Sequence, residues 1–499
     1  MIIESIFAHA RRTPDAPALN AGGPVVGYRA LAARITLARR FLTTLGLAPG
    51  CVAAICIDSN PDAWVIGLAL RSLGVTTVNP RSSAEIAQFG VRAVVAFEAR
   101  HATWPGLPEA ASAAGAQLIL APRDLFVGSE ALAPARTAPS DAPPGGHILL
   151  TSGTTGEYKK VLIPAAAEAV IAASNAAVIG LRNDTDIHVF DFGGWTAAGY
   201  FWPIAAWWVG ADVVVCQHER AWLSPSLVGG ARRKALIVAP HLVARLLAAP
   251  PETPLRDDAM TAFVVGGMLS SVQWQAARER LTRDIRSIFG ATETALVTCT
   301  RLETAEDLRW HRINPGIEAQ IVDDDDQPLP AGQVGALRVR PTRVEGYLDD
   351  PAATRDFFRD GYFYPGDLAV IGPDGRLSLQ GRRTDVINVL GSKFATLPIE
   401  VALQDQLSAV AVCVFSAPGE TGEEVHVAIQ PGRPLEAAAL QAALVDAMPP
   451  GISSVRVHTV SGFARNHMGK IDRAALMAQL VPRPDPAGSG PDRPSDSPG

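Results

Sequence analysis

The sequence predicts an α/β protein: a large N-terminal domain of α/β subdomains with a small β-barrel-like subdomain, followed by a small mobile α+β domain. Over roughly the first 300 residues, short β-branched runs alternate with Ala- and Leu-rich stretches of helical length, which indicates parallel sheets covered by helices. From about residue 316, short strands are separated by Asp, Gly and Pro turns, which is typical of an antiparallel sheet. A hydrophobic fraction of 48% and a charged fraction of 19% fit a globular chain with a sizeable core.

The elements of the N-terminal part follow from its apolar runs. We expect a helix near Ala63–Leu73 and strands at Val52–Ile57, Val75–Val78, Ala93–Phe97, Leu118–Leu120, Ala235–Val238 and Ala262–Val265. The most apolar segment, 196–215, contains Pro203 and Asp212. A buried helix that leads into a strand at Asp212–Cys216 fits this segment better than a membrane span.

The later elements divide the chain into domains. We expect an N-terminal domain over 1–383, a β-subdomain at about 316–381 within it, a mobile C-terminal domain over 384–482 and a disordered tail over 483–499. The β-subdomain has predicted strands at Ile317–Val322, Gly335–Arg340, Leu368–Ile371 and Arg376–Gln380. The C-terminal domain mixes strands at Ala409–Phe415, Glu424–Ile429 and Val455–Thr459 with helices near Leu397–Leu407 and Leu435–Asp446.

Charge and cysteine content narrow the function classes. The net charge of −6, without any block of five basic residues, argues against a nucleic-acid surface. The N-terminus lacks the residue order of a signal peptide, and the five cysteines lack the spacing of a zinc site. We therefore expect a cytoplasmic protein with reduced cysteines, no nucleic-acid partner and no membrane span.

The stretch from Thr151 to Lys160 is the most informative motif. Its hydroxyls, glycine N–H groups and lysines suit an anionic phosphate, and they come from Thr151, Ser152, Gly153, Thr154, Thr155, Gly156, Lys159 and Lys160. The apolar runs at 147–150 and 161–163 predict a strand on each side, so the loop differs from a Walker loop, which opens a helix. Taken alone, the same residue types also fit a solvated hairpin turn.

Two further motifs supply groups that suit a nucleotide. In Phe289-Gly-Ala-Thr-Glu-Thr294, the aromatic ring can stack on a base, and Glu293 beside the hydroxyl of Thr292 suits Mg²⁺ that carries phosphate oxygens. In Tyr364-Pro-Gly-Asp367, a carboxylate in a turn can accept hydrogen bonds from the two hydroxyls of a ribose. Taken singly, Glu293 also fits a surface carboxylate, and the second motif fits an ordinary turn.

The last two motifs lie in the C-terminal third. Gly381-Arg-Arg-Thr-Asp385 supplies guanidinium groups, with Arg382 able to bind ribose or phosphate. Asn466-His-Met-Gly-Lys-Ile-Asp-Arg473 places Lys470 after a glycine, in a turn that leads into a helix. Alone, Lys470 fits an exposed lysine at a helix start. Five such motifs in this order, over about 320 residues, argue against chance.

In these motifs the chain resembles the superfamily of AMP-forming adenylating enzymes, which includes acyl-CoA synthetases, amino-acid adenylation domains and luciferases. The resemblance covers roughly residues 1–482 and is greatest to acyl-CoA synthetases. It implies that residues 151–160 hold the β- and γ-phosphates of ATP, that Thr292 contacts the α-phosphate and that Glu293 holds Mg²⁺. It further implies that Lys470 bridges the substrate carboxylate and the α-phosphate.

The resemblance also implies a binding pocket for the rest of the nucleotide. Phe289, with Gly290 beside it, stacks near adenine, and Gly266 and Gly267 line the same pocket. Asp367 binds the ribose hydroxyls with Arg382 nearby. The implied reaction is ATP-dependent activation of a carboxylic acid to acyl-AMP, followed by thioester formation with coenzyme A. The C-terminal domain of such enzymes rotates about a hinge between these two half-reactions.

The chain departs from the family pattern at two places. Tyr158-Lys159-Lys160 stands where Pro-Lys-Gly is usual, so Lys159 matches the family lysine and Lys160 replaces a glycine. Thr384 stands at the hinge position where Asp is usual, and Lys393 stands where Arg is usual. The first departure predicts a stiffer or more cationic loop, and the second bears on thioester formation.

The motifs do not identify the acid substrate or the acyl acceptor. Phe190-Asp-Phe-Gly-Gly-Trp195 shares its Asp and Trp spacing with amino-acid adenylation domains, in which the Asp binds the substrate amine. Asp191 and Trp195 are therefore substrate-pocket candidates, although Asp191 also fits a helix cap. The aromatic run 200–208 fits an acyl pocket or simply the core. The alternatives to a CoA ligase are an enzyme that loads the phosphopantetheine of a carrier protein and a catalytically silent nucleotide-binding relative.

Overall fold

A computed structural model describes most of the chain, in two compact units, Met1–Leu379 and Gln380–Gly499. The described residues are 2–98, 101–129, 132, 143–152, 158–190, 192–216, 232–250, 252–341, 344–389, 392–419, 423–452, 454–465 and 471–481. The division between the units lies a few residues before the border expected at 383. The tail expected over 483–499 lies outside the described residues.

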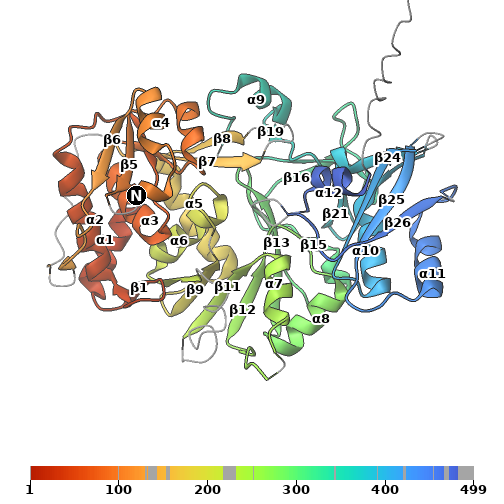
Figure 1. Cartoon of the computed structure of the whole chain (residues 1–499). Helices are drawn as coiled ribbons and strands as arrows, with labels where there is room; N and C mark the ends of the chain where they lie inside the picture. Colours follow the sequence, from red (N-terminus) through yellow and green to blue (C-terminus); the bar gives the residue numbers. More distant parts are fainter. Residues whose placement is uncertain are drawn as a thin grey trace, which may run out of the picture. The chain divides into compact units, whose positions relative to one another are not determined.

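One sheet of the first unit carries the predicted phosphate loop (Figure 1). Its strand order is β6-β5-β3-β4-β7-β8, and only the β7–β8 pair is antiparallel. The strands are β3 (Val52–Ile55), β4 (Thr76–Val78), β5 (Ala93–Phe97), β6 (Gln117–Ala121), β7 (His147–Ser152) and β8 (Tyr158–Ile163). The strands expected in this region are confirmed. They form here because their β-branched residues are buried on both faces of a parallel sheet.

A second sheet has the order β14-β13-β12-β11-β9-β10-β1-β2. The pairs from β1 through β13 are parallel, whereas β1–β2 and β13–β14 are antiparallel. The strands are β1 (Pro17–Asn20), β2 (Val26–Gly27), β9 (Thr185–Phe190), β10 (Asp212–Cys216), β11 (Arg233–Val238), β12 (Met260–Val264), β13 (Asp284–Ala291) and β14 (Ala295–Arg301). The strand expected at Asp212–Cys216 is therefore confirmed.

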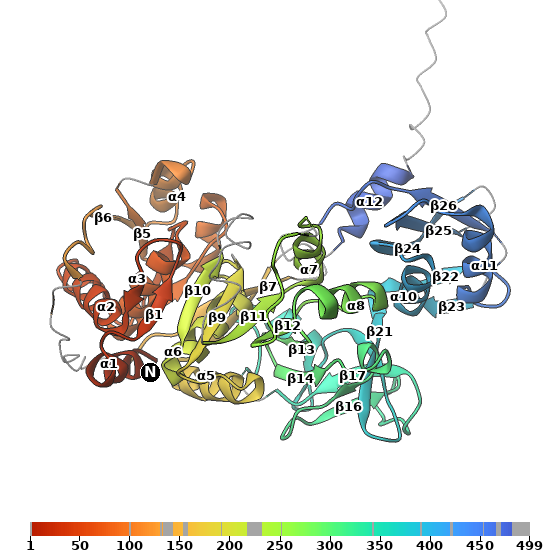
Figure 2. The ribbon, with the colours of Figure 1, turned by 90° about the horizontal axis from the view of Figure 1, so that it is seen from below.

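Helices pack on these sheets, and α5 and α6 pack against each other beside the second sheet (Figure 2). The helices of the first unit are α1 (Ile2–Arg12), α2 (Tyr28–Thr43), α3 (Asn60–Ser72), α4 (Leu107–Ala113), α5 (Ala165–Ile179), α6 (Ala197–Val209), α7 (Pro240–Leu247), α8 (Ser271–Arg280) and α9 (Pro351–Phe357). The largest apolar core joins both sheets through α3, α5 and α6. Along β3, Ala53 and Ile55 face this core while Ala54 faces the smaller core under α4, as the two-residue period of a strand requires.

The apolar segment 196–215 is a core helix followed by a strand, as predicted. Tyr200, Phe201, Trp202 and Trp207 of α6 are buried in the main core, and only Trp208 is exposed, at 37%. In the ranges that the structure describes, no helix combines the length and apolar character that a membrane crossing requires.

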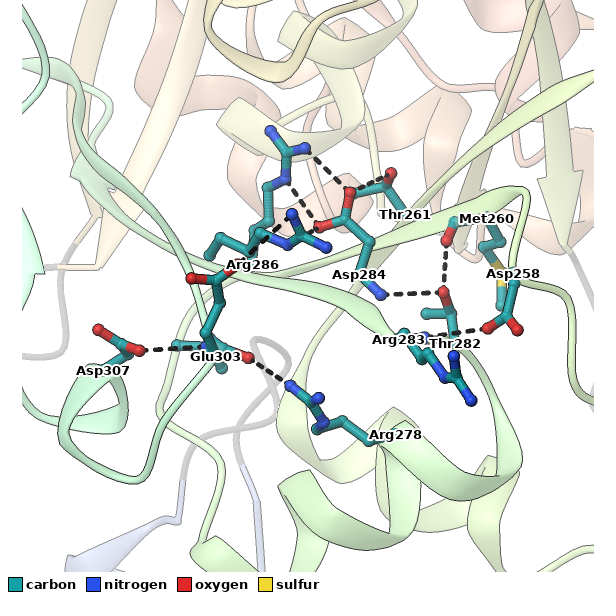
Figure 3. A network of polar contacts seen from close by, with 12 residues as sticks. Asp258, Met260, Thr261, Arg278, Thr282, Arg283, Asp284, Arg286, Glu303 and Asp307 are labelled. Atoms are coloured by element: carbon teal, nitrogen blue, oxygen red, sulfur yellow. Dashed lines mark hydrogen bonds and ion pairs between the residues drawn. The ribbon is translucent and has the colours of Figure 1, made fainter.

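Polar contacts tie the ends of β12, β13 and β14 together (Figure 3). The Asp284 carboxylate accepts hydrogen bonds from Arg286 at 2.9 Å and from the Thr261 hydroxyl at 3.1 Å, and it lies 3.4 Å from Arg301. The backbone N–H of Asp284 donates to the Thr282 hydroxyl. These contacts hold the strand β13 at the end opposite the motif that begins at Phe289.

The β-subdomain is a separate, mainly antiparallel sheet. Its strands are β15 (His311–Arg312), β16 (Ala319–Val322), β17 (Gly335–Val339), β18 (Phe358–Arg359), β19 (Tyr362–Phe363), β20 (Asp367–Ile371) and β21 (Arg376–Arg382). The pairing order is β15-β21-β20-β17-β19-β18, with β16 also on β17. In the described residues this path has two ends, so the expected barrel-like subdomain is an open sheet and not a closed barrel.

The second unit has the expected α+β composition. A hairpin of β22 (Val386–Val389) and β23 (Ser392–Ala395) precedes a three-stranded sheet of β24 (Ala411–Pro418), β25 (Glu423–Gln430) and β26 (Val455–Thr459). Its helices are α10 (Thr396–Leu407), α11 (Ala437–Ala447) and α12 (Arg473–Leu480). Apolar residues of α10 and of the inner sheet face, such as Leu403, Val414 and Val427, form its own core.

Candidate functional site

The predicted phosphate loop lies at the tip of the β7–β8 hairpin. Thr151 pairs with Lys159 and Ser152 pairs with Tyr158, so the two strands flank residues 153–157. The predicted strand on each side of the loop is confirmed. Gly153, Thr154, Thr155 and Gly156 lie outside the described residues. Of the residues predicted to bind phosphate, Thr151 and Lys159 lie opposite each other in the antiparallel register of β7 and β8.

The β13–β14 hairpin brings Glu293 into the same region. Ala291 pairs with Ala295, so the turn consists of Thr292, Glu293 and Thr294. The Thr294 hydroxyl accepts from the Ala291 N–H at 3.1 Å, and Ala295 adopts a φ of 84°. A non-glycine residue in this left-handed region is strained, and such strain is often found at functional sites.

Gly290 fits the close approach of the two strands in this hairpin. A Cβ atom on Gly290 would lie 2.2 Å from the Ala295 carbonyl oxygen, which no side chain could tolerate without movement of the backbone. The strand register also shifts between Phe289 and Gly290. The sequence therefore needs glycine here to form the turn that carries Glu293.

Glu293 is only 4% exposed, although it is a carboxylate. Burial raises its pKa, while hydrogen bonds from the Tyr347 and Thr151 side chains and the charge of Lys159 act in the opposite direction. The Tyr347 hydroxyl donates to Glu293 Oε1 at 2.8 Å. The structure thus brings Thr151 and Lys159 to the buried carboxylate of Glu293, which lies more than 130 residues after them in sequence.

The Lys159 ammonium lies over aromatic rings. Its Nζ is 3.1 Å from the centre of the Phe357 ring and 5.2 Å from the centre of the Tyr347 ring. The negative face of an aromatic ring attracts a cation. Phe357 ends α9, and Tyr347 precedes that helix, so one segment supplies both rings.

The unusual residues on either side of Lys159 also have identified contacts. The Tyr158 ring lies under the Arg81 guanidinium, 3.7 Å from its Cζ. Lys160 Nζ lies 3.2 Å from Asp349 Oδ2 and 3.3 Å from the Gln88 carbonyl oxygen. Lys160 on β8 therefore has protein partners that a glycine at this position could not contact.

Asp367 begins β20 and is 7% exposed. Gly366 before it adopts a φ of 82°, the left-handed conformation that the Tyr364-Pro-Gly turn requires. The backbone N–H of Tyr364 donates to the Phe357 carbonyl at 2.8 Å. Through this contact, the turn that carries Asp367 is joined to the segment that packs on Lys159.

The predicted adenine-pocket residues lie on β13 or just after the neighbouring strand β12. Gly266 and Gly267 follow β12, and Gly266 has a φ of 77°. Phe289 lies on the adjacent strand β13, where its half-buried ring packs against the apolar core of the β-subdomain. The ring thus has a packing role, and its stacking near adenine stays a prediction.

The segment with the substrate-pocket candidates runs beside β7. Asp191 lies outside the described residues. Both interpretations of Asp191 therefore stay predictions. The N-cap of α6 is Thr196, whose side chain accepts from the Gly199 N–H at 2.9 Å. The Trp195 carbonyl accepts from the Leu150 N–H at 2.9 Å, so the backbone of Trp195 contacts strand β7 of the β7–β8 hairpin.

The second unit holds the remaining predicted residues. Arg382 ends β21, and Thr384 lies in the short 3-10 helix Arg383–Asp385 that follows. The Thr384 hydroxyl lies 3.3 Å from Asp385 Oδ1. Lys470 lies outside the described residues, shortly before α12. The hinge role of Thr384, the ribose contact of Arg382 and the role of Lys470 stay predictions.

Sequence reasoning missed Tyr347 and Phe357. Both are aromatic residues in the stretch Gly346-Tyr-Leu-Asp-Asp-Pro-Ala-Ala-Thr-Arg-Asp-Phe357, which reads as a turn and a short helix. A signal was present, since an aromatic residue between glycine and two aspartates is unusual for a plain turn. Its partners lie on other hairpins, however, so the sequence alone does not connect it to Glu293 or Lys159.

A sequence model described as "AMP-binding enzyme" matches residues 6–348, which is more than half of the chain. The chain belongs to this family. The predicted resemblance to AMP-forming adenylating enzymes is therefore confirmed.

Relatives of this AMP-binding enzyme include a nonribosomal peptide synthetase and a CoA ligase. It is 25% identical, over 94% of its length, to a probable nonribosomal peptide synthetase, CymA, of Salinispora arenicola. It is 30% identical, over 54% of its length, to 2-hydroxy-7-methoxy-5-methyl-1-naphthoate–CoA ligase of Streptomyces carzinostaticus. These matches span only 6% and 50% of the two relatives.

The fold matches a solved structure over nearly the whole chain. ATP-bound MatB from Rhodopseudomonas palustris superimposes with a TM-score of 0.81 at 20% identity, covering 95% of this chain and 98% of MatB. The predicted α/β fold with a further α+β unit is confirmed.

Proposed function

We propose that this AMP-binding enzyme is an AMP-forming acid–thiol ligase that converts a carboxylic acid to an acyl adenylate and then to a thioester of coenzyme A. The observation that carries this proposal is that Thr151 and Lys159 meet at the buried carboxylate of Glu293. A lysine and an anion beside a hairpin of hydroxyl residues suit a triphosphate with its metal ion.

The donors present fit Mg²⁺. Glu293 is a carboxylate, Thr151 a hydroxyl, and Mg²⁺ takes oxygen ligands from one or two protein groups and from substrate phosphates. Among the described residues, no group of three or more His, Cys, Asp or Glu side chains could hold a metal ion. Bound there, Mg²⁺ would neutralise phosphate charge that Lys159 alone could not balance.

The first half-reaction then needs positioning more than covalent chemistry from the protein. A carboxylate oxygen of the acid attacks the α-phosphorus of ATP, the bond to the β-phosphate oxygen breaks, and pyrophosphate leaves. Lys159 and the hairpin hydroxyls bind the departing phosphates, and Asp367 orients the ribose. Lys470 would bring the two anions together by balancing their charge.

In the second half-reaction, a thiolate attacks the carbonyl carbon of the acyl adenylate and AMP leaves. We propose CoA as the thiol, because the motif set resembles acyl-CoA synthetases most. The nonribosomal peptide synthetase among the relatives and the Phe-Asp-x-x-x-Trp spacing at 190–195 support a second candidate, an enzyme that loads the phosphopantetheine of a carrier protein. A small-molecule carboxylate is the proposed substrate in both cases.

Pyrophosphate release tests the proposal, measured on a panel of carboxylic acids with and without CoA and combined with mass spectrometry of the acyl product. We expect acid-dependent pyrophosphate and an acyl-CoA. Acyl-AMP that reaches only a carrier protein would replace the CoA proposal with the second candidate. No release with any acid would favour a catalytically silent nucleotide-binding relative.

Two variants test individual roles. Lys470→Ala should slow adenylation by on the order of 10²–10³, as expected for loss of a positioned charge. A variant with the full rate would refute the role of Lys470. Asp191→Ala should abolish activation of amino acids only, if Asp191 binds an amine; an unchanged substrate profile would remove that assignment.

A further inference from the structure

We propose that Tyr347 is a positioning residue of this site: its hydroxyl orients the Glu293 carboxylate toward Mg²⁺, and its ring, with that of Phe357, restricts Lys159 to the phosphate side. The inference rests on the proposed function, since it assumes that ATP and Mg²⁺ bind here. It assigns a role to the segment 346–358, which the sequence motifs do not include.

Tyr347 is in direct contact with the Glu293 carboxylate. The Tyr347 hydroxyl donates to Glu293 Oε1 at 2.8 Å, and Tyr347 is 7% exposed. A hydrogen bond to a charged, buried acceptor is stronger and more directional than one at the surface. Because it engages one named oxygen, it limits rotation of the carboxylate about its terminal torsion, which is otherwise broad.

The rings of Tyr347 and Phe357 contact Lys159. Lys159 Nζ lies above both aromatic rings, at 3.1 Å from Phe357 and 5.2 Å from Tyr347. A lysine side chain has about 2 kcal/mol of rotamer entropy to lose on binding. Rings that already hold the ammonium near Glu293 reduce that loss when a phosphate arrives, which is the benefit of preorganisation.

Hydrogen bonds and ring packing hold the segment 346–358 in place. The backbone N–H of Tyr347 donates to the Thr354 hydroxyl at 2.9 Å, and that hydroxyl also donates to the Asp350 carbonyl at 2.8 Å. A Cβ atom on Gly346 would lie 2.7 Å from Thr354 Cγ2, so any larger residue would force the Thr354 side chain to shift. The Tyr347 ring packs edge-on against Phe357 and Phe358.

The segment is also linked to the β7–β8 hairpin. The Leu348 N–H donates to the Lys160 carbonyl at 2.8 Å, and Asp349 pairs with the Lys160 ammonium at 3.2 Å. Three consecutive residues, 347–349, therefore contact either Glu293 or the β8 strand. The segment joins the metal-binding side of the site to its phosphate-binding side.

Calorimetric titration of Mg²⁺ into the whole chain mixed with a non-hydrolysable ATP analogue tests this role, alongside pyrophosphate release at varied free Mg²⁺. Tyr347→Phe removes only the hydroxyl, and we expect the half-saturating Mg²⁺ concentration to rise about tenfold, as for loss of one hydrogen bond to a charged group. At saturating Mg²⁺, kcat should stay within about threefold of the wild type, because the groups that act on the phosphates are unchanged.

The matched control is Tyr28→Phe. Tyr28 is fully buried and its hydroxyl also donates at 2.8 Å, but to the Ala211 carbonyl. This variant should lose stability without any change in the Mg²⁺ midpoint. Tyr347→Leu, which also removes the ring beside Lys159, should raise the KM for ATP in addition. Thr354→Val removes the acceptor of the Tyr347 N–H and should shift the Mg²⁺ midpoint in the same direction. This variant tests the positioning role of Tyr347 if Tyr347→Phe does not fold.

The outcomes separate the inference from the proposed function. A wild-type chain that binds the ATP analogue without any Mg²⁺ dependence would overturn the proposed function. A wild-type chain that binds both, with an unmoved midpoint in Tyr347→Phe, would overturn the inference alone. An equal shift in Tyr28→Phe would also overturn it, because the effect would then be one of stability.

Discussion

The Arg71 guanidinium and the Glu168 carboxylate form a buried ion pair between α3 and α5, with 3.1 Å between Nη2 and Oε1. Their side chains are only 5% and 2% exposed. Glu168 also accepts from the Tyr200 hydroxyl at 2.7 Å and from the Ile2 N–H at 3.1 Å. This one carboxylate therefore joins α1, α3, α5 and α6 inside the main core.

Glu168→Gln should destabilise the N-terminal unit strongly. The change leaves the Arg71 charge buried without its counter-ion, which costs about 3–5 kcal/mol. The measurement is the free energy of unfolding in urea. The control is Glu303→Gln, which removes an exposed pair with Arg301 at 3.5 Å and should cost less than about 1 kcal/mol (Figure 3). Equal losses in the two variants would contradict the expectation.

Asp212 should make the stability of the chain fall as the pH rises. Burial, and then the nearby charge of Asp186, raise its pKa to about 7, although Arg232 opposes them. Between about pH 4 and pH 7 the folded state holds a proton that the unfolded state has released, so folding is penalised more as the pH rises. Asp212→Asn should remove this slope.

The urea midpoints of the wild type and of Asp212→Asn, measured from pH 4 to pH 8, check this prediction. The difference between them should grow in favour of the variant up to about pH 7 and then stay constant. A constant difference over the whole range would mean that Asp212 titrates normally.

Lys159 and Lys160 should differ in function although they are neighbours. Lys159 lies beside Glu293 and over two aromatic rings, whereas Lys160 pairs with the exposed Asp349. Lys159→Ala should lower kcat/KM for ATP by on the order of 10²–10³. Lys160→Gly, which restores the usual family residue, should change it less than tenfold, because an ion pair with one exposed partner contributes little.

Pyrophosphate release at varied ATP measures both variants. If Lys160→Gly has the larger loss, the assignment of Lys159 to the family lysine position is wrong.

Arg473 should anchor the segment that follows Lys470. Its guanidinium donates to Glu400 Oε1 and to the Val414 carbonyl, each at 2.8 Å, and its Nε lies 3.5 Å from Asp385, next to the hinge candidate Thr384. Arg473→Gln leaves the buried Glu400 without its cation and should cost about 3 kcal/mol in the stability of the second unit.

Adenylation by Arg473→Gln should also slow, with an unchanged KM for ATP, because the lysine segment loses its anchor. Urea unfolding and pyrophosphate release measure the two effects. Arg456→Gln is the control, since its pair with Glu424 lies on the exposed edge of the sheet. A stable Arg473→Gln with a normal rate would contradict the anchoring role.

Most elements were predictable because their signals are local. The strand at Ala93–Phe97 is a β-branched run that the structure reproduces at the same residues, and the helix at Leu397–Leu407 starts one residue earlier. The hairpin that flanks the predicted phosphate loop was predictable for the same reason. The sequence could not predict whether the β-subdomain closes into a barrel or stays an open sheet. Strand pairing depends on which strand edges meet and not on the pattern of any one strand.

The sequence by itself determined the fold class and the family, and it predicted Thr151, Lys159, Glu293 and Asp367 as site residues, because short motifs encode the turns that carry them. Only the tertiary structure decided what surrounds Glu293. Tyr347 and Phe357 have no motif of their own, and they reach the site because packing places α9 against the β8 strand. Contacts of this kind depend on the burial of whole elements, which no local pattern records.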